Sequence, residues 1–316
     1  MTQRIAYLSW PPNEISGGIK MAFAHVEALR EAGWEAVIAT PGAGMPTWFE
    51  SDAPVIDTSE LVADQDILVF PENHHRFLKS LASWPNRKLV FCQNQFMVHR
   101  GLKGSRDYAD FGVRGILCVG RHALDFCRRR FPSQPISSVP VFIDHDLFCF
   151  QPQKRLQIAF TPRKRPLEAA FIQDLFRAEN PGFRDIPWVQ ISGVPTRTVA
   201  QILKESAIYL SLCRFECVPL TALEALACGC VTAGFTGFGA REYTTAKNGF
   251  WATEDDCLDC VTQLTRAVRT VTAGGPSHSE MLEAAHISAS YYSRQRFASR
   301  LVEFWRVYLS DKGSSG

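Results

Sequence analysis

The sequence predicts an α/β protein with two Rossmann-like, doubly wound domains that face a cleft. Short apolar runs alternate with amphipathic helical stretches along most of the chain, as in parallel sheets built from βαβ units. At 316 residues the chain is longer than one hydrophobic core usually supports. The polar segment 150–155 interrupts the alternation, and a second set of strands and helices follows it. We therefore expect one domain over 1–150 and a second over 151–294.

In the first half, the predicted strands are almost wholly apolar, as expected for strands buried on both faces of a parallel sheet. The helix at 19–31 carries Met21, Val26 and Leu29 on one face and stops at Gly33. Strands are expected at 5–8, 36–39, 66–70, 89–92 and 115–119, and helices at 19–31, 76–83 and 122–130.

The second half repeats this alternation. Strands are expected at 158–160, 188–191, 207–212 and 231–233, and helices at 167–178, 197–205, 220–227 and 257–272. Two more helical stretches follow Pro276. The last of them, at about 295–310, carries Phe297, Phe304 and Trp305 in an amphipathic pattern, so we expect it to pack on one of the two domains.

Composition excludes several classes of protein. The chain is 46% hydrophobic and 21% charged, which is ordinary for a soluble globular protein. Its net charge of +2 is too near zero to indicate a nucleic-acid partner. No apolar run approaches the ~20 residues of a membrane span, and 1–5 leads directly into a strand rather than a secretory signal. A cytoplasmic location is expected, with peripheral contact at the inner face of a membrane left open.

The ten cysteines do not predict a metal site. Most lie in apolar strands or helices, where reduced, buried thiols are expected. Cys257 and Cys260 form a CxxC pair, and Cys228 and Cys230 lie close together, but these spacings do not make a matched set of four ligands.

Two carboxylates, Glu216 and Glu224, are the most informative residues of the chain. Glu216 should lie in the loop at the carboxyl end of strand 207–212. Glu224 should face inward about a turn and a half into the helix that Pro219 begins. Ligands of open α/β sheets bind at that end, and helix N-termini attract phosphate. The pair therefore predicts hydroxyl recognition on a ligand that also carries phosphate, with Val218, Pro219 and Leu220 beside it.

A cluster of cations follows the first strand of the second half. Arg163, Lys164 and Arg165 stand at the carboxyl end of strand 158–160, where three cations suit a diphosphate. A solvated basic turn is the alternative. Glu254-Asp255-Asp256 is most simply a helix N-terminal cap.

Glycines mark two further loops. Gly17 and Gly18 open the helix after the first strand, where backbone amides can approach a phosphate, although a plain strand-to-helix turn is the alternative. The missing G-x-G-x-x-G pattern argues against a dinucleotide-binding oxidoreductase. The second loop, 234–243, contains Gly237 and Gly239 and follows the strand at 231–233.

These residues resemble the nucleotide-binding domain of retaining GT-B glycosyltransferases, specifically glycosyltransferase family 4. The resemblance rests on the E-x7-E pattern at Glu216 and Glu224, on Ala225-Leu226-Ala227-Cys228-Gly229 after it, and on the glycine-rich loop that ends near 248–249. Gly17 and Gly18 resemble the family's N-terminal loop. Dense matching is confined to about 193–249.

The resemblance implies roles for these residues. Glu216 would contact hydroxyls of the donor sugar near the reacting centre, and Glu224 would bind the ribose hydroxyls. Arg163 and Lys164 would bind the diphosphate and stabilise its developing charge, which makes them catalytic together with Glu216. The implied donor-binding residues are Glu224, Gly17, Gly18, Gly193, Val218, Pro219, Leu220, Gly237 and Gly239.

The sequence departs from the family in two places. The family spaces its Arg and Lys as R-x4-K, whereas Arg163 and Lys164 are adjacent, so which of them makes the main diphosphate contact stays open. Many members carry a histidine near the acceptor. Here Gln93 and Asn94 stand at that position and are the expected acceptor contacts. His74, His75 and His99 are candidates to replace the missing histidine, but the preferred interpretation places them in surface loops. The D-x-D pattern at 144–146 lies at the domain junction, so no metal is expected.

The resemblance implies a metal-independent hexosyltransferase of polysaccharide biosynthesis. It would move a sugar from a nucleotide-diphosphate sugar to a hydroxyl of a glycan, a lipid-linked acceptor or a small molecule, with retention of configuration. The leaving phosphate would help to deprotonate the acceptor, and no cofactor is needed. In this fold the helix at 295–310 packs back on the first domain. A sugar-nucleotide epimerase on the same fold and a non-catalytic nucleotide-sugar binder are the alternatives.

Overall fold

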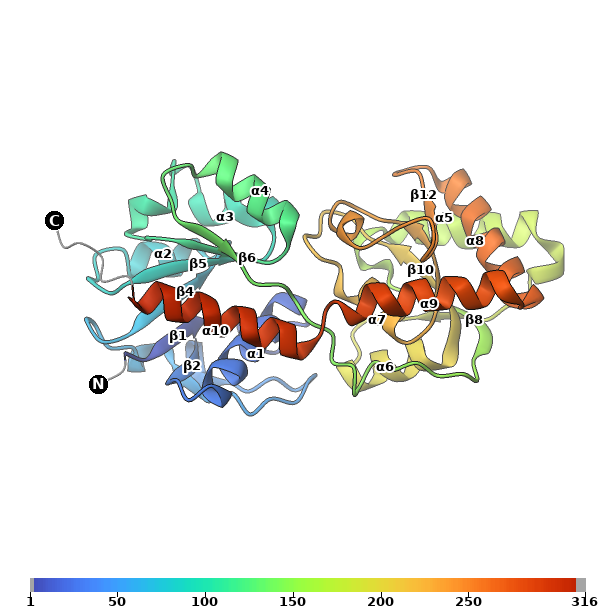
Figure 1. Ribbon diagram of the computed structural model, residues 1–316. Coiled ribbons are helices and arrows are strands. Elements are labelled where there is room, and N and C mark those ends of the chain that lie inside the picture. Colours follow the sequence, from blue (N-terminus) through green and yellow to red (C-terminus); the bar gives the residue numbers. More distant parts are fainter. Residues whose placement is uncertain (1–2, 311–316) are drawn as a thin grey trace. The chain divides into compact units, whose positions relative to one another are not determined.

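Figure 1 shows the computed structural model, which describes residues 3–310. The chain forms two compact units. Unit 1 comprises the described residues up to Val141 together with the C-terminal segment from Gln295, and unit 2 is Phe142–Arg294. Each unit has its own parallel sheet, and each is described by itself. No helix within 3–310 has the length and apolar character that crossing a membrane would require.

Unit 1 is built on a seven-stranded parallel sheet in the order β3-β2-β1-β4-β5-β6-β7. The strands are β1 (Ile5–Leu8), β2 (Ala36–Thr40), β3 (Val55–Asp57), β4 (Ile67–Pro71), β5 (Lys88–Cys92), β6 (Ile116–Cys118) and β7 (Ile136–Ser138). The helices are α1 (Gly17–Glu31), α2 (His75–Ser80), α3 (Val98–Leu102), α4 (Arg121–Arg130) and α10 (Arg294–Ser310). The strand order reverses between β1 and β4, so the loops after these two strands lie at a switch point where Rossmann sheets bind ligands.

The C-terminal helix α10 contributes to the core of unit 1. Trp305 is fully buried, and its indole N–H donates a hydrogen bond to the Tyr7 hydroxyl over 3.3 Å. The Tyr7 hydroxyl also bonds His25 Nδ1 over 3.0 Å. Burial lowers the pKa of His25 to about 3, so this histidine is neutral. One turn further along α10, the Arg87 guanidinium lies 4.2 Å from the ring centroid of Tyr308.

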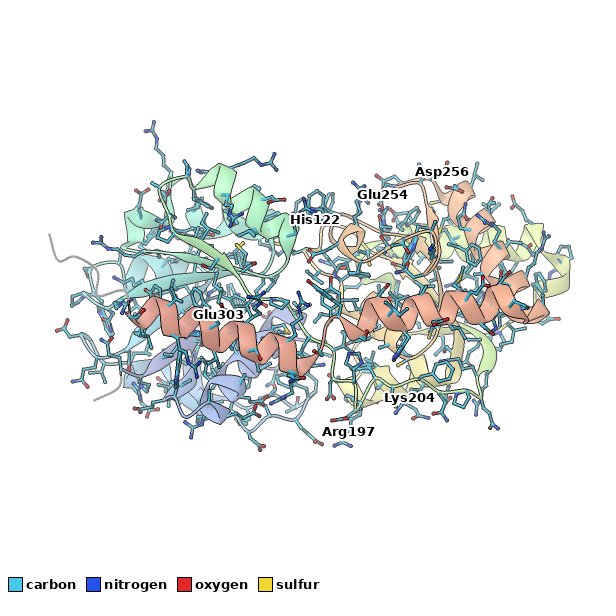
Figure 2. All side chains as sticks on the ribbon, viewed as in Figure 1. His122, Arg197, Lys204, Glu254, Asp256 and Glu303 are labelled. Carbon is cyan, nitrogen blue, oxygen red and sulfur yellow. The ribbon has the colours of Figure 1, made fainter. Side chains whose placement is uncertain are left out.

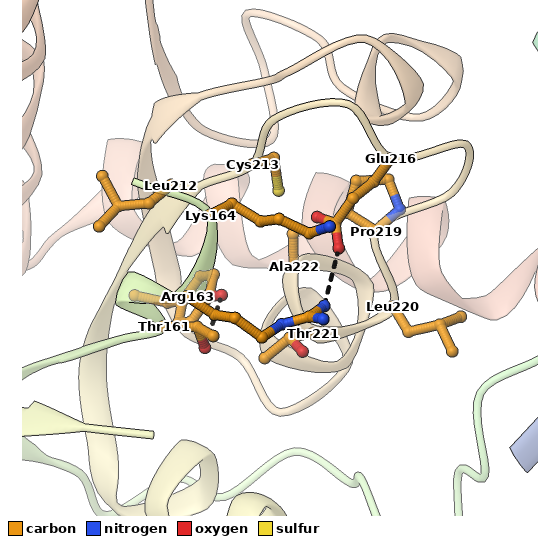
Figure 3. A pocket seen from close by; sticks show the side chains of 11 residues that line it. Thr161, Arg163, Lys164, Leu212, Cys213, Glu216, Pro219, Leu220, Thr221 and Ala222 are labelled. Carbon is orange, nitrogen blue, oxygen red and sulfur yellow. Dashed lines mark hydrogen bonds and ion pairs between the residues drawn. The ribbon is translucent and has the colours of Figure 1, made fainter. Parts of the chain in front are cut away.

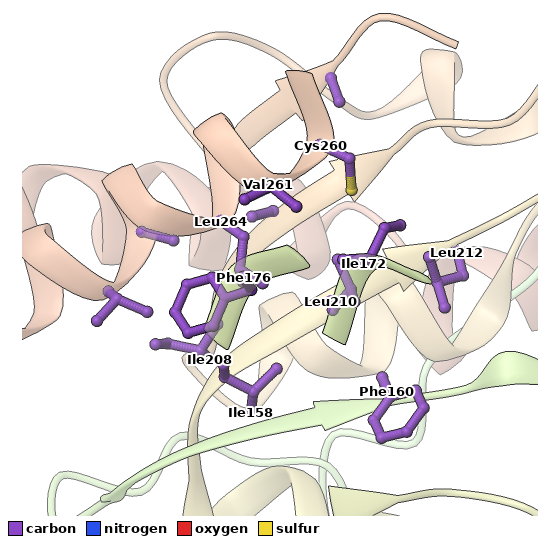
Figure 4. Packing of buried hydrophobic residues seen from close by; sticks show 14 of the residues in the cluster. Ile158, Phe160, Ile172, Phe176, Ile208, Leu210, Leu212, Cys260, Val261 and Leu264 are labelled. Carbon is purple, nitrogen blue, oxygen red and sulfur yellow. The ribbon is translucent and has the colours of Figure 1, made fainter. Parts of the chain in front are cut away.

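Unit 2 is built on a five-stranded parallel sheet in the order β12-β11-β10-β8-β9. The strands are β8 (Arg155–Phe160), β9 (Trp188–Gln190), β10 (Ser206–Leu212), β11 (Val231–Phe235) and β12 (Phe250–Ala252). The helices are α5 (Pro166–Glu179), α6 (Thr196–Glu205), α7 (Leu220–Ala227), α8 (Cys257–Ala273) and α9 (Pro276–Ser290). Figure 4 shows Ile158, Ile208 and Leu210 of the sheet packed with Phe176 of α5 and Leu264 of α8.

The predicted fold class is confirmed: each unit is an α/β domain in which helices connect the strands of a parallel β-sheet. The sequence pattern did not predict β3, β7 and β12, which all stand at sheet edges. Each has three residues and several half-buried or exposed side chains, so none shows the apolar run of a central strand. It also missed the one-turn helix α3.

Candidate functional site

The topology of unit 2 brings two loops together. β8 and β10 are neighbours, with Phe160 paired to Leu210, and the strand order reverses between them. Helices after the two strands leave on opposite faces of such a sheet, which opens a crevice at its carboxyl edge. The loop after β8 carries Arg163 and Lys164, and the loop after β10 carries Glu216.

A pocket lies where these loops meet, as Figure 3 shows. The sequence-predicted residues Arg163, Lys164, Glu216, Pro219 and Leu220 all line it. Its other described lining residues are Thr161, Tyr209, Leu212, Cys213, Thr221 and Ala222. Leu220, Thr221 and Ala222 form the first turn of α7, whose free amides and positive dipole end favour an anion. The pocket therefore combines one carboxylate, two cations and a helix N-terminus.

Glu216 and Arg163 form an ion pair across the pocket. Arg163 Nη2 lies 3.3 Å from Glu216 Oε1, and the two side chains are 60% and 24% exposed. Burial raises the pKa of Glu216, while the nearby Lys164 and Arg163 oppose that rise. A pair this exposed contributes little to stability, so Arg163 can exchange Glu216 for a ligand phosphate at small cost.

Glu224 is separate from this pocket. It is 7% exposed, sits in α7 about one turn after Leu220, and lies outside the set of described residues that line the pocket. Its charge contributes to raising the pKa of the buried Tyr209. The Tyr209 hydroxyl donates to the Thr161 hydroxyl in the pocket wall. Val218 is half-buried in the same loop as Glu216.

Arg165 does not join Arg163 and Lys164 as the cation cluster predicted. Its side chain is 1% exposed and points into unit 2. Its guanidinium ion-pairs with Glu254 at 3.0 Å, Asp255 at 2.5 Å and Glu168 at 3.3 Å. Its remaining contacts are a hydrogen bond of 3.2 Å to the Cys213 carbonyl and a stacking contact on Phe235.

Through these contacts Arg165 links the loops around the pocket to one another. Through Cys213 it holds the loop that leads to Glu216. Through Glu254, whose carboxylate accepts a hydrogen bond of 2.9 Å from the Thr236 hydroxyl, it holds the glycine-rich loop. Figure 2 labels Glu254 and Asp256 between β12 and α8. Of the three acidic residues there, only Asp256 caps α8, accepting from Leu258 and Asp259.

The glycine-rich loop packs on the backbone that carries Glu216. A Cβ built on Gly239 would lie 1.9 Å from the Cys217 carbonyl oxygen, and one on Gly237 would lie 2.9 Å from the Cys213 carbonyl carbon. Gly237 also has a φ of +58°. The resemblance implied that these glycines let the loop lie against sugar and phosphate; on the Cβ side of each, the space is filled by protein backbone. Their close packing on the backbone of Cys213 and Cys217 helps to fix the position of Glu216.

Replacing Gly239 by Ala is expected to move this loop, because backbone cannot yield to a methyl group 1.9 Å away. We expect a loss of about 1–3 kcal/mol in unfolding free energy, which urea unfolding measures. The matched control is Gly182→Ala, where a Cβ meets nothing within 4 Å. Equal behaviour of the two variants would contradict the packing role.

Gly193 follows β9, the edge strand beside β8, and has a φ of +65°. It lies outside the set of described residues that line the pocket. Its conformation alone accounts for a glycine there, because few other residues adopt a positive φ.

Unit 1 brings the other predicted residues together at its own carboxyl edge. Gly17 and Gly18 begin α1, and Gln93 follows β5. The Gln93 amide Nε2 donates a hydrogen bond of 2.9 Å to the Gly18 carbonyl. Asn94 Oδ1 accepts from the Phe96 amide over 3.1 Å, so this side chain caps the short 3₁₀ turn Gln95–Met97. The carboxylate of Glu72 accepts a hydrogen bond of 3.2 Å from the backbone N–H of Gln93 and so supports the same loop.

His74 is not a surface-loop histidine. It is 7% exposed and stacks between Trp10 and Phe77, with ring centroids 3.9 and 3.7 Å away. Burial lowers its pKa to about 4, so it is neutral at physiological pH.

Glu72 is a buried carboxyl group in unit 1 whose pKa is shifted towards neutrality. Its side chain is buried at the end of β4, and burial raises its pKa from 4.5 to about 7. A raised carboxyl pKa stabilises the folded state fully below pH 4.5, and that contribution is lost as pH rises to about 7. The shift corresponds to about 3 kcal/mol of unfolding free energy.

The neutral variant Glu72→Gln should lack this dependence. Between about pH 5 and about pH 8 we expect its stability relative to the unaltered protein to rise by about 3 kcal/mol. Urea unfolding at the two pH values measures this difference, in which the other titrating groups cancel. A difference that does not change with pH would contradict the assignment.

Three cysteines gather in unit 1. The sulfur atoms of Cys92, Cys118 and Cys127 lie within 4.8 Å of one another, and all three residues are fully buried. Strand pairing explains the first contact, because Cys92 and Cys118 are register partners in β5 and β6. Cys127 reaches them from α4.

No family model matches the chain. Its sequence is 27% identical over 241 residues to an alpha-1,6-glucosyltransferase of Actinobacillus pleuropneumoniae serotype 7 (strain AP76). The aligned segment covers 73% of this chain and 72% of the relative. An alpha-glucosyltransferase solved with UDP-glucose and DNA matches with a TM-score of 0.66 and 12% identity, over 98% of this chain and all of that one.

S. aureus TarM, solved as a mutant with UDP, alpha-GlcNAc-glycerol and fondaparinux, matches with a TM-score of 0.61 and 12% identity. The match covers 77% of this chain and 56% of TarM. These structures show that the chain has the GT-B fold. Together with the sequence relative they support a glycosyltransferase of the GT-B type.

Proposed function

We propose that this chain transfers a glycosyl group from a UDP-sugar to an acceptor hydroxyl, with retention of anomeric configuration. The observation that carries the proposal is the pocket at the switch point of unit 2. There Glu216, Arg163, Lys164 and the first turn of α7 meet. A nucleotide sugar needs the same set of groups: cations and helix amides for the diphosphate, and a carboxylate for sugar hydroxyls.

The chemistry follows from the charges. As the bond between sugar and phosphate breaks, negative charge grows on the diphosphate, and Arg163, Lys164 and the α7 amides stabilise it. These groups take the part that a metal ion plays elsewhere, so no metal and no cofactor is part of the proposal. Glu216 positions the sugar. The leaving phosphate accepts the acceptor proton on the same face, so no enzyme nucleophile is required.

Two arguments support retention. The E-x7-E pattern at Glu216 and Glu224 resembles the retaining glycosyltransferase family 4. The sequence relative is named for an α-1,6 linkage. Because UDP-glucose carries its nucleotide in the α configuration, an α product means retention. The same name makes glucose the first donor sugar to test and a sugar hydroxyl the first acceptor.

Other parts of the proposal rest on the sequence. Glu224 would bind the ribose, and Gly17, Gly18, Gln93 and Asn94 would serve donor closure and acceptor binding. We propose a cytoplasmic enzyme acting on a glycan or lipid-linked acceptor, without a nucleic-acid partner. Since two similar structures contain DNA, DNA belongs among the acceptors tested.

Thermal shift with a nucleotide panel tests donor binding. UDP and UDP-glucose should stabilise the protein, by about 2.7 kcal/mol at a concentration of a hundred times Kd. UMP, which lacks the second phosphate, should stabilise it much less, and a chelator should change nothing. If no nucleoside diphosphate raised the melting temperature, the proposal would fail. Binding without UDP release in the presence of acceptors would instead indicate a non-catalytic binder.

A further inference from the structure

The first turn of α7, which lines the pocket, starts at a proline. Pro219 is the N-cap residue, and its side chain has no acceptor for the first helical amides. Its carbonyl accepts the first hydrogen bond of the helix from the Leu223 amide, but that bond is long, at 3.5 Å. The direction of the amides of 220–222 therefore depends on what else holds Pro219.

The Tyr243 hydroxyl makes the shorter hydrogen bond at this carbonyl. It donates to the Pro219 oxygen over 2.9 Å, the phenol is 6% exposed, and Pro219 is buried as well. Burial raises the pKa of Tyr243 well above its ordinary value, so the hydroxyl keeps its proton and acts as a donor. A phenylalanine at 243 would remove the shorter of these two hydrogen bonds and keep the ring.

Tyr243 is itself held in place at the end of the glycine-rich loop. Its backbone N–H donates to the Ala240 carbonyl over 3.0 Å, and its carbonyl accepts from the Asn248 side chain over 2.7 Å. Its ring meets the ring of Tyr292 edge-on, with centroids 6.0 Å apart. The loop therefore fixes the hydroxyl, and through the hydroxyl it fixes the Pro219 carbonyl.

We propose that Tyr243 is a positioning residue for the diphosphate of the donor: through Pro219, its hydroxyl holds the first turn of α7 so that the amides of 220–222 point into the pocket. The inference rests on the proposed function, in which these amides and Lys164 bind the diphosphate. Hydrogen bonds weaken steeply as their angle closes, so a small turn of the helix end weakens phosphate binding. The same turn also weakens the stabilisation of charge on the leaving diphosphate.

The test compares Tyr243→Phe with Tyr108→Phe. Tyr108 is the matched control, because it is fully buried in unit 1 and its hydroxyl donates to the Glu72 backbone carbonyl over 2.6 Å. Each substitution keeps the ring and removes one buried hydrogen bond from a phenol to a carbonyl. For each variant the melting temperature, the Kd of UDP and of UMP, and kcat and KM for the donor are measured. UMP keeps the nucleoside and one phosphate, so the ratio of the two Kd values isolates the second phosphate.

We expect both variants to melt about 2–4 °C below the unaltered protein, since each loses one hydrogen bond. Tyr243→Phe should bind UDP about tenfold more weakly and keep its UMP affinity within about twofold. Its kcat should also fall about tenfold, because the same amides stabilise the leaving diphosphate. Tyr108→Phe should keep both nucleotide affinities within about twofold of the unaltered protein.

Three results would overturn the inference. The first is an unchanged UDP affinity in Tyr243→Phe. The second is an equal loss of UDP and UMP affinity, which would indicate a general disturbance of the pocket. The third is an equal loss of UDP affinity in Tyr108→Phe, which would trace the effect to stability alone. Failure of the proposed function shows separately, as an unaltered protein that binds no UDP.

Discussion

Glu216→Gln is expected to lower kcat/KM for sugar transfer by about 100-fold or more, while UDP itself binds as before. The amide has the shape of the carboxylate but lacks its charge, so the sugar hydroxyls lose a charge-assisted acceptor. UDP lacks the transferred sugar and does not need that acceptor. Steady-state kinetics with the donor and a UDP titration separate the two effects. Glu179→Gln, at an exposed site at the end of α5, is the control and should behave as the unaltered protein.

The pH dependence of this position gives a second readout. Burial raises the pKa of Glu216, so the ionised carboxylate is lost as pH falls, beginning above the ordinary carboxyl range. Transfer by the unaltered protein should therefore decline on the acid side, and the residual activity of Glu216→Gln should lack that decline. Full donor turnover in Glu216→Gln would remove Glu216 from the catalytic set.

Arg165→Met is expected to cost about 2–3 kcal/mol of unfolding free energy. The substitution removes a buried guanidinium and leaves Glu254, Asp255 and Glu168 without their shared partner. The estimate lies below that for a fully buried ion pair because these acids are themselves 26%, 63% and 27% exposed. UDP binding should weaken as well, because the loops that form the pocket lose their common anchor.

Arg163→Met is the matched comparison for Arg165→Met in unfolding free energy and UDP affinity. Arg163 stands two positions earlier and is 60% exposed, so its loss should leave stability within about 0.5 kcal/mol and act on diphosphate affinity alone. Arg165→Lys should not restore stability, since a single ammonium cannot span three carboxylates. Urea unfolding and UDP titration of the three variants decide. The account is wrong if Arg163→Met unfolds readily and Arg165→Met does not.

Much of this architecture could be predicted from the sequence, for physical reasons. Central strands such as 207–212 and 231–233 are buried on both faces and are therefore almost wholly apolar. The strand–loop–Glu216–Pro219–helix pattern predicted a carboxylate at the edge of the sheet. The edge strands β3, β7 and β12 escaped prediction because several of their side chains are half-buried or exposed and their three residues carry no clear period.

The direction of adjacent side chains could not be predicted. Arg163, Lys164 and Arg165 look alike in the sequence, yet the first two line the pocket and the third is buried beneath it. What separates them is the position of Glu254 and Asp255, about 90 residues away, which no local pattern shows. In the same way, the neighbours that require Gly237 and Gly239 are backbone atoms of another loop.

The most direct test of the account is a crystal structure with a bound, non-transferable UDP-sugar. We predict the diphosphate within about 3 Å of Lys164 and of the first amides of α7, with Arg163 turned towards it. A sugar hydroxyl should bond Glu216, and the ribose should lie on the side of Glu224. A nucleotide bound with its diphosphate away from Arg163 and Lys164, or with its sugar away from Glu216, would contradict the account.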